Sequence, residues 1–360
     1  MAIGTATRTP WWAWAWPLLA WMMLALHLLL HENVLITALE ALALIATVFA
    51  AVYHAEVVAH KVGEPFGSLV LALAVTIIEV ALIVSVMITG GGDNSALARD
   101  TIFAAVMIVC NGIVGVCLLG GGLRHREQDF QLHGAKAALS VLIALTALSM
   151  VFPNVTTSTT GGTYSSSQLI FAAIVSLALY GAFLFVQTIR HRDYFLPVEI
   201  ETEHAAPPSP RIAAASAGLL IIALVAIVGL AKVLTPTVKR AVASADAPES
   251  AVGIVIAALV LLPEGLAAFR SARANRLQTS MNLALGSVLA SIGLTIPAVA
   301  VVSIVLHQPL TLGLGPKEIV LLFVTLILSQ STLGTGRTTV LQGIVHLVIF
   351  AAFLFLAVVP

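Results

Sequence analysis

The sequence predicts an all-α polytopic membrane protein with about 11 transmembrane helices, one extra N-terminal helix plus two inverted five-helix repeats. Hydrophobic residues make up 59% of the 360 residues and charged residues only 9%, with a mean hydropathy of +1.05. Soluble domains carry about 25% charged residues. Apolar runs reach the ~20 residues that a helix needs to cross the hydrocarbon core. Two of these runs resemble each other, and each contains a glutamate.

Eleven spans are predicted, each from an apolar run bounded by polar or turn residues. They cover residues 11–30, 33–56, 66–89, 99–120, 133–153, 167–190, 212–234, 250–270, 279–306, 317–333 and 338–358. The first run is longer than the about 7–15 apolar residues of a cleaved signal peptide, so we interpret it as an uncleaved span. Its five tryptophans, between Trp11 and Trp21, suit an interfacial anchor.

The basic residues predict how the spans are oriented. If the loops alternate between the two sides, 12 of the 17 Lys and Arg lie on the side of the N-terminus and 5 on the other. Positive residues concentrate on the cytoplasmic side. We therefore expect a multi-pass protein of a bacterial inner (plasma) membrane, with a cytoplasmic N-terminus and an external C-terminus.

Glu79 and Glu264 lie inside apolar spans, where an ionisable side chain costs roughly 3 kcal/mol or more to insert and marks a functional site. At an offset of 185 residues, Val70, Ala72, Val75 and Glu79 fall on Val255, Ala257, Val260 and Glu264. Eleven spans equal one plus twice five, and a repeat with an odd number of spans is inserted upside down relative to its copy. Both carboxylates are therefore expected near the midplane.

This count divides the chain into four parts. Residues 1–32 form the extra N-terminal transmembrane helix, 33–190 the first five-helix repeat, 191–211 a cytoplasmic linker and 212–360 the second five-helix repeat. The linker contains prolines and scattered charges, which favour a flexible connection. A regulatory cation site within the linker is an alternative interpretation.

Two buried carboxylates can exchange a cation for protons. A carboxyl group in a low-dielectric site holds a proton readily near neutral pH, whereas an arriving cation favours the ionised form and expels that proton. Two carboxylates match one divalent ion or two protons, which favours Ca²⁺ as the transported ion and leaves Na⁺ or K⁺ open. No resident cofactor is expected. Glu79 and Glu264 are the predicted metal and proton ligands.

Calcium takes about 6–8 oxygen ligands, so other groups must assist the two acids. Pro263 and Gly265 are expected to interrupt the helix around Glu264 and free backbone carbonyls. Thr76 lies one turn before Glu79. Further supporting ligands are predicted on the third span of each repeat: Asn111, Asn282, Ser287 and Ser291. Helix packing by small and hydroxyl residues is the alternative role for these side chains.

Glu56 and His346 are candidates for proton transfer or gating. Glu56 belongs to a cluster with His54 and His60 near the predicted cytoplasmic end of its span, where histidines titrate near neutrality. A solvated helix end is the alternative role for the cluster. His346 follows Gln342 by four residues and shares its face. Interhelical hydrogen bonding is the favoured role for His346.

Five sequence segments resemble the calcium/cation antiporter superfamily, in its bacterial branch of calcium/proton and sodium-potassium/proton exchangers. They are HAEVVAHKVGEPFG followed by VTIIEVALI, then LLPEGLAA, NLALGSVLASIGLTIPAV and TGRTTVLQGIVHLVIF. The resemblance implies an inverted five-plus-five repeat behind an extra first helix, with Glu79 and Glu264 as the shared cation and proton site. The sequence departs from the family's Gly-Asn-x-x-Glu pattern, because Thr76 and Leu261 stand three residues before the glutamates.

The leading function is therefore proton-coupled cation antiport by alternating access, most simply Ca²⁺ export in exchange for H⁺. A monovalent Na⁺/K⁺ antiporter with the same site is the alternative, and a cation channel with an acidic filter is an alternative of another class. No catalytic motif indicates an enzyme. The net charge of zero argues against nucleic acid as a partner. Cys110 and Cys117 lie too far apart along one helix to bond to each other.

Overall fold

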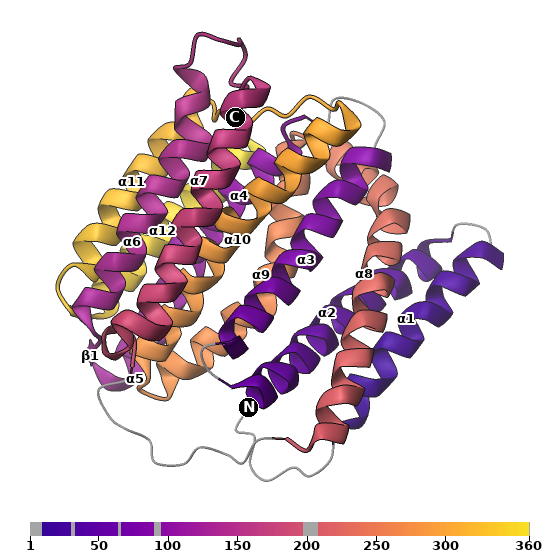
Figure 1. Cartoon of the computed structure of the whole chain (residues 1–360), viewed down its shortest axis with the longest axis horizontal. Coiled ribbons are helices and arrows are strands. Elements are labelled where there is room, and N and C mark those ends of the chain that lie inside the picture. The colour runs from indigo at the N-terminus through magenta and orange to yellow at the C-terminus, as the bar shows by residue number, and fades with distance from the viewer. Residues whose placement is uncertain (1–8, 30–32, 64–65, 90–94, 197–207, 360) are drawn as a thin grey trace. The chain divides into compact units, whose positions relative to one another are not determined.

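A computed structural model describes residues 9–29, 33–63, 66–89, 95–196 and 208–359. It is built almost entirely of helices (Figure 1). Residues 197–207 of the predicted linker lie outside the described part of the chain.

Each of the eleven predicted spans coincides with a helical segment. Within the described part of the chain, ten segments are long and apolar enough to cross a membrane, and the remaining predicted span coincides with helix α3. The first six are α1 (Trp11–Leu29), α2 (Val34–Val62), α3 (Phe66–Thr89), α4 (Leu97–Met107) continued by the π-helical turn η1 (Ile108–Ile113) and α5 (Val114–His125), α6 (Leu132–Thr146) continued by η2 (Ala147–Val151) and η3 (Phe152–Asn154), and α7 (Ser166–Phe185) continued by η4 (Val186–Arg190). The others are α8 (Pro210–Ser244), α9 (Ser250–Arg273), α10 (Leu277–Leu306), α11 (Pro316–Leu333) and α12 (Val340–Val358). The prediction of a polytopic helical protein is confirmed.

Local sequence signals explain where several helices begin and end. The Asn33 side chain accepts a hydrogen bond from the Leu35 amide, 3.0 Å away, and so caps α2. Ser165 with Gln168, and Thr339 with Gln342, form reciprocal capping boxes before α7 and α12. These caps satisfy amide groups that would otherwise be unpaired at the helix ends.

The chain divides into two compact units. The smaller unit comprises residues 1–92 and 201–241, and it contains α1, α2, α3 and most of α8. The larger unit comprises residues 93–200 and 242–360, and it contains α4 to α7 and α9 to α12.

In the smaller unit, side-chain hydrogen bonds fasten α1 to its neighbours. His54 bonds the Ala13 carbonyl at 2.9 Å, and His27 Nδ1 lies 2.9 Å from Oε1 of the buried Glu40, within hydrogen-bond distance. Trp21 donates its indole N–H to the Ile222 carbonyl on α8 at 3.2 Å. The additional N-terminal helix is thus held to the first span of each predicted repeat.

In the larger unit, helices from the two predicted repeats interlock. The fifth span of the first repeat, α7, packs against α10, which is the third span of the second repeat. The fifth span of the second repeat, α12, packs correspondingly against α5 and η1 in the third span of the first. The fourth spans, α6 and α11, contact each other. This exchange of partners is the pattern expected of a twofold-related pair.

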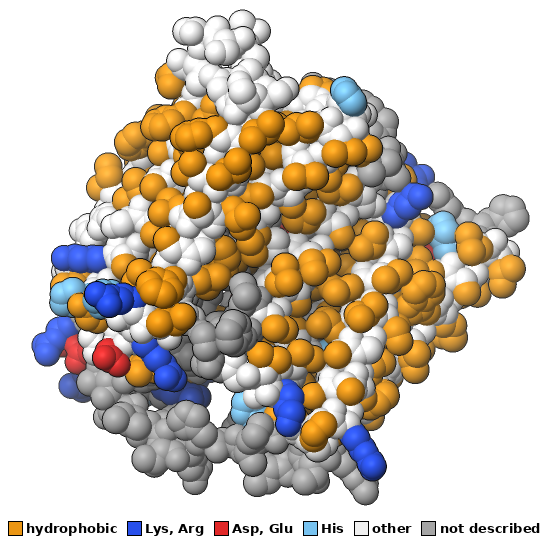
Figure 2. Space-filling view, viewed as in Figure 1, with side chains coloured by type: hydrophobic (Ala, Val, Ile, Leu, Met, Phe, Trp, Pro, Cys, Tyr) orange, Lys and Arg blue, Asp and Glu red, His pale blue; other side chains and the backbone are white. Residues whose placement is uncertain are grey.

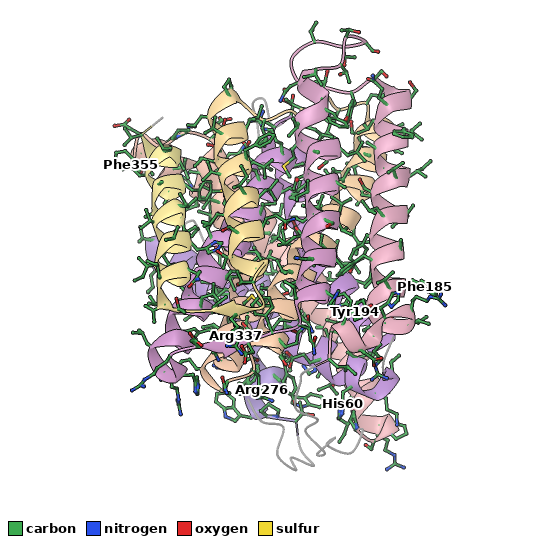
Figure 3. All side chains as sticks on the ribbon, turned by 90° about the vertical axis from the view of Figure 1, so that its left-hand side faces the viewer. His60, Phe185, Tyr194, Arg276, Arg337 and Phe355 are labelled. Atoms are coloured by element: carbon green, nitrogen blue, oxygen red, sulfur yellow. The ribbon has the colours of Figure 1, made fainter. Side chains whose placement is uncertain are left out.

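Loop pairings at the two ends of the larger unit establish the inverted relation. The loop after α5 contains β1 (Gln128–Asp129), which pairs antiparallel with β2 (Arg337–Thr338) before α12. At the other end of α6, Thr163 bridges Thr311 in the loop after α10. The loop between third and fourth spans thus lies at opposite ends in the two repeats. Figure 3 shows Arg276 and Arg337 at one end of the unit and Phe355 at the other.

The outer surface of the larger unit is apolar along its helices. Exposed aromatic and aliphatic side chains include Phe171, Ile174, Phe323, Ile327 and Val348. Figure 2 shows hydrophobic side chains over the visible helical face of this unit, with Lys and Arg gathered towards the end where β1 lies. This distribution suits helices that face lipid between two polar boundaries.

Cysteine labelling tests the predicted orientation. Thr157 and Glu127 are exposed at opposite ends of α6, whereas the native Cys110 and Cys117 are free and buried. We expect Thr157→Cys to react with a membrane-impermeant maleimide in intact cells. Glu127→Cys should react only after permeabilisation. The reverse result would place the β1 end outside and overturn the orientation derived from the basic residues.

Candidate functional site

Glu264 lies in α9, in the interior of the larger unit. Its side chain is only 7% exposed. Pro263 and Leu261 on the same helix are also buried. An acid at such a position is costly to bury, so it is a functional-site candidate on physical grounds.

The expected break in the helix at Pro263 is wrong. Helix α9 runs without interruption from Ser250 to Arg273, with Pro263 inside it. A proline within a helix nevertheless lacks the N–H that would bond the carbonyl four residues earlier, here Leu259. Membrane helices tolerate such a proline where other groups satisfy the freed carbonyl. An unbroken helix can therefore still release one carbonyl close to Glu264.

Glycines allow α9 to approach the third span of the first repeat closely. A Cβ built on Gly253 would lie 2.8 Å from the Thr101 nitrogen and 2.9 Å from the Asp100 carbonyl carbon. A Cβ on Gly265 would lie 3.1 Å from Ile113 Cδ1 in η1. Gly265 is thus a packing residue beside Glu264 rather than a helix breaker.

The hairpin of α9 and α10 determines which serines lie level with Glu264. Counted from Asn275 in the turn, Glu264 lies 11 residues before and Ser287 12 residues after. Antiparallel helices rise equally from a turn, so Ser287 lies near the level of Glu264, and the buried Ser291 lies about 6 Å beyond it.

Asn282 lies about 6 Å nearer the turn than Glu264 on the same count. Its amide donates to the Phe195 carbonyl at 2.5 Å, and its oxygen accepts from Gln278 at 2.9 Å. Asn282 therefore holds the segment after α7 against α10. This bonding argues against the predicted role as a supporting ligand.

Asn111 also has a role other than the expected one. It lies in η1, two residues before Ile113, and residues two apart on a helix point to nearly opposite sides. Ile113 faces α9, whereas the Asn111 amide donates to Thr325 Oγ1 on α11 at 2.8 Å. Its Oδ1 lies 3.2 Å from His346 Nδ1 on α12. The predicted ligand Asn111 thus points away from the helix that carries Glu264.

The structure joins Asn111 and His346 in one buried polar cluster. His346 Nε2 lies 3.1 Å from Thr332 Oγ1, and the Thr325 hydroxyl donates to Met107 Sδ at 3.4 Å. The Asn111 and His346 side chains are fully buried. His346 therefore makes interhelical hydrogen bonds, the role favoured from the sequence.

The sequence interpretation missed Thr325 and Thr332. A signal was available, because Thr325, Ser329 and Thr332 are spaced by four and three residues and share one face of α11. All three side chains are buried. Hydroxyl residues on one face of a membrane helix indicate a contact with another polar helix face.

In the smaller unit, α3 carries Glu79, which is 4% exposed, and Thr76 one turn earlier, which is also buried. Glu56 on α2 is exposed, whereas its neighbour His54 is fully buried against the Ala13 carbonyl. The prediction that His54 belongs to a cluster with Glu56 and His60 at the cytoplasmic end of the span is therefore wrong, because His54 is buried against α1. The remaining intramembrane acid of α2, Glu40, is paired with His27.

A cavity of about 150 Å³ lies at the end of the larger unit where α4, α9 and α11 begin. Its charged lining consists of two ion pairs. Arg99 Nε donates to Asp100 Oδ1 at 2.8 Å, and Lys317 lies 3.5 Å from Glu318. Opposite charges balance in this cavity, so its lining carries no net charge.

Comparison with known proteins identifies the family. The sequence model of the sodium/calcium exchanger protein family matches residues 32–189 and 215–359. The chain belongs to this family. The two matched segments coincide closely with the two repeats expected from the sequence.

Individual relatives match over most of their length. A candidate ionic transporter of Sinorhizobium fredii is 48% identical over 99% of this chain and 98% of its own. The sodium-potassium/proton antiporter of Escherichia coli is 37% identical over 89% of this chain and 87% of its own. The structure of the Ca²⁺/H⁺ antiporter YfkE matches with a TM-score of 0.72 and 16% identity, over 97% of this chain and 98% of that one. This structural likeness confirms the fold.

Substitution of Gly253 tests the close packing that holds α9. In Gly253→Ala the new methyl group meets backbone atoms of α4, which cannot rotate away, so we expect a loss of about 1–3 kcal/mol in stability. Thermal unfolding of the purified protein in detergent measures the loss. Gly181→Ala is the matched control, because its Cβ would have no atom within 4 Å. Equal unfolding temperatures for both variants would contradict the packing described here.

Proposed function

We propose that this protein is a proton-coupled cation antiporter in which Glu79 and Glu264 bind the transported cation and the protons in turn. The observation that carries the proposal is one buried acid at the equivalent position of each inverted repeat. Membership of the sodium/calcium exchanger family supports cation exchange as the activity. That both carboxylates bind the same ion remains a prediction from the sequence.

Charge balance explains why exchange follows from two carboxylates. The site holds either two protons on neutral carboxyl groups or one Ca²⁺ between two carboxylates, and both forms have the same total charge. The doubly protonated site and the Ca²⁺-bound site carry no net charge, so each can be buried at a similar cost. The empty site carries two negative charges, which are costly to bury in a low-dielectric interior. The occupied site can therefore become exposed to the other side of the membrane, whereas the empty site cannot. This difference couples the movement of the cation to the movement of protons.

The oxygen ligands beyond the carboxylates are proposed from position. In the larger unit, Ser287 and Ser291 on α10 and the Leu259 carbonyl freed by Pro263 lie along the same hairpin as Glu264. In the smaller unit, Thr76 lies one turn from Glu79. Hydroxyl and carbonyl oxygens are the ligands that Ca²⁺, Na⁺ and K⁺ take in proteins. We propose Ca²⁺ as the principal cation because two carboxylates neutralise one divalent ion.

A second candidate is exchange of Na⁺ or K⁺ for protons. It is favoured by the 37% identity to the sodium-potassium/proton antiporter of Escherichia coli. The absence of the family's asparagine three residues before each glutamate also removes two amide oxygens from the site. Fewer amide oxygens leave the site short of ligands for Ca²⁺, which takes about 6–8 oxygens.

Neutral substitutions test the role of the two acids. Glu79→Gln and Glu264→Gln preserve side-chain size but neither bind nor release a proton, so we expect each to lower exchange to the background of vesicles without the protein. The assay measures cation-driven proton movement in everted vesicles with a pH-sensitive dye. Glu40→Gln is the matched control, since this buried acid is paired with His27, and it should retain exchange. Full exchange in both site variants would refute the proposed mechanism.

A cation panel distinguishes the candidate substrates. Proteoliposomes with a lower pH inside than outside are supplied in turn with external Ca²⁺, Na⁺ and K⁺. The release of protons from the liposomes is then measured. We expect the strongest response to Ca²⁺. A response to Na⁺ or K⁺ alone would establish the second candidate. Electrical current without proton movement would instead indicate a channel.

A further inference from the structure

We propose that Asn111 and His346 are positioning residues that hold the π-helical turn η1 against α9 beside Glu264. They bind no ion themselves. The inference rests on the proposed function, because the group being positioned is the Glu264 side of the exchange site. It assigns a different role from ion ligation to Asn111, and a different role from proton transfer to His346.

The hydrogen bonds of the cluster are directional. The Asn111 amide nitrogen donates to Thr325, so the Asn111 oxygen faces His346. An amide oxygen only accepts, which requires the hydrogen of the imidazole to be on Nδ1. Nε2 then accepts from the Thr332 hydroxyl. A neutral imidazole satisfies every one of these contacts, and no cation is needed to complete the cluster.

The cluster fixes η1 from the side opposite to α9. Threonines of α11 and His346 of α12 bind the Asn111 face of η1. On the other face, Ile113 lies against Gly265, the residue after Glu264. A π-helical turn is less regular than an α-helix and is frequently found at functional sites. The side-chain network provides the lateral support that the irregular backbone needs to keep its contact with α9.

Gly112 in η1 and Gly115 at the start of α5 show that this span also fits closely against α12. A Cβ on Gly112 would lie 3.2 Å from the Phe350 ring, and one on Gly115 would lie 2.9 Å from Leu347. Helix α12 thus contacts η1 and α5 with little space to spare. A change in the His346 contact is therefore transmitted to η1 rather than absorbed by a gap.

Two substitutions of His346 separate its two hydrogen bonds. The amide nitrogen of Asn occupies the position of Nδ1, so His346→Asn keeps the bond to Asn111 and loses the bond to Thr332. The terminal amide of Gln reaches the position of Nε2, so His346→Gln keeps Thr332 and loses Asn111. Thr325→Val removes the other partner of Asn111. Thr146→Val is a matched control, since Thr146 is buried and its hydroxyl bonds the Leu142 and Ile143 carbonyls of its own helix.

Cation-driven proton movement is measured for each variant over a range of Ca²⁺, Na⁺ and K⁺ concentrations at fixed pH. We expect His346→Gln and Thr325→Val to raise the KM for the transported cation about fivefold, the effect of one neutral hydrogen bond, with a smaller change in maximum rate. His346→Asn and Thr146→Val should keep the wild-type KM. Thermal unfolding of each purified variant is measured alongside.

The outcomes separate the two proposals. If wild-type protein moves no protons with any of the three cations, the proposed function fails. If wild-type protein exchanges but His346→Gln and His346→Asn show the same KM, the positioning role is wrong. A fall in maximum rate that follows the loss of thermal stability, with KM unchanged, would also overturn it. Loss of exchange in His346→Asn with normal folding would indicate proton transfer through the imidazole instead.

Discussion

The close approach of α9 to the third span of the first repeat is the contact on which the larger unit depends. Gly253 and Gly265 lie at the two ends of this contact, and neither has room for a side chain without displacement of its neighbour. They are separated by 12 residues, about 18 Å along the helix. Two such points fix both the distance and the rotation of α9. Because Glu264 lies beside the second point, this packing contributes to its position.

Interlocking of the repeats makes that packing resistant to change. Helices α7 and α12 each pack against the third span of the other repeat, so neither repeat can leave without uncovering a buried face. Without water in the bilayer core, helix association depends on such close contacts and on interhelical hydrogen bonds. The paired loops, β1 with β2 at one end and Thr163 with Thr311 at the other, close both ends of the unit. Glu264 therefore lies in a unit whose packing depends on helices from both repeats.

The eleven spans could be predicted from composition because helix length in a membrane is set by the thickness of the hydrocarbon core. Glu264 could be identified as a candidate site residue because an acid is costly to bury in a membrane span. The continuity of α9 through Pro263 could not be predicted from the sequence, since it depends on how neighbouring groups satisfy the freed carbonyl. The direction of the Asn111 side chain could not be predicted either. A π-helical turn changes the angle between successive side chains, and the hydrophobic periodicity of the sequence does not reveal it.

Polar residues in the spans differ in how they satisfy their hydrogen bonds, some within their own helix and others across helices. The hydroxyls of Thr101, Thr146 and Ser149 bond the carbonyl four residues earlier in their own helix, at 2.6–2.8 Å. Such bonds need no other element and carry no information about a site. Asn111 and His346 instead join three helices, so the loss of either partner leaves a buried polar group unsatisfied and shifts helices relative to one another. A count of intramembrane polar residues therefore overestimates ion ligands, and the cross-helix bonds distinguish residues that orient a site from those that merely tolerate burial.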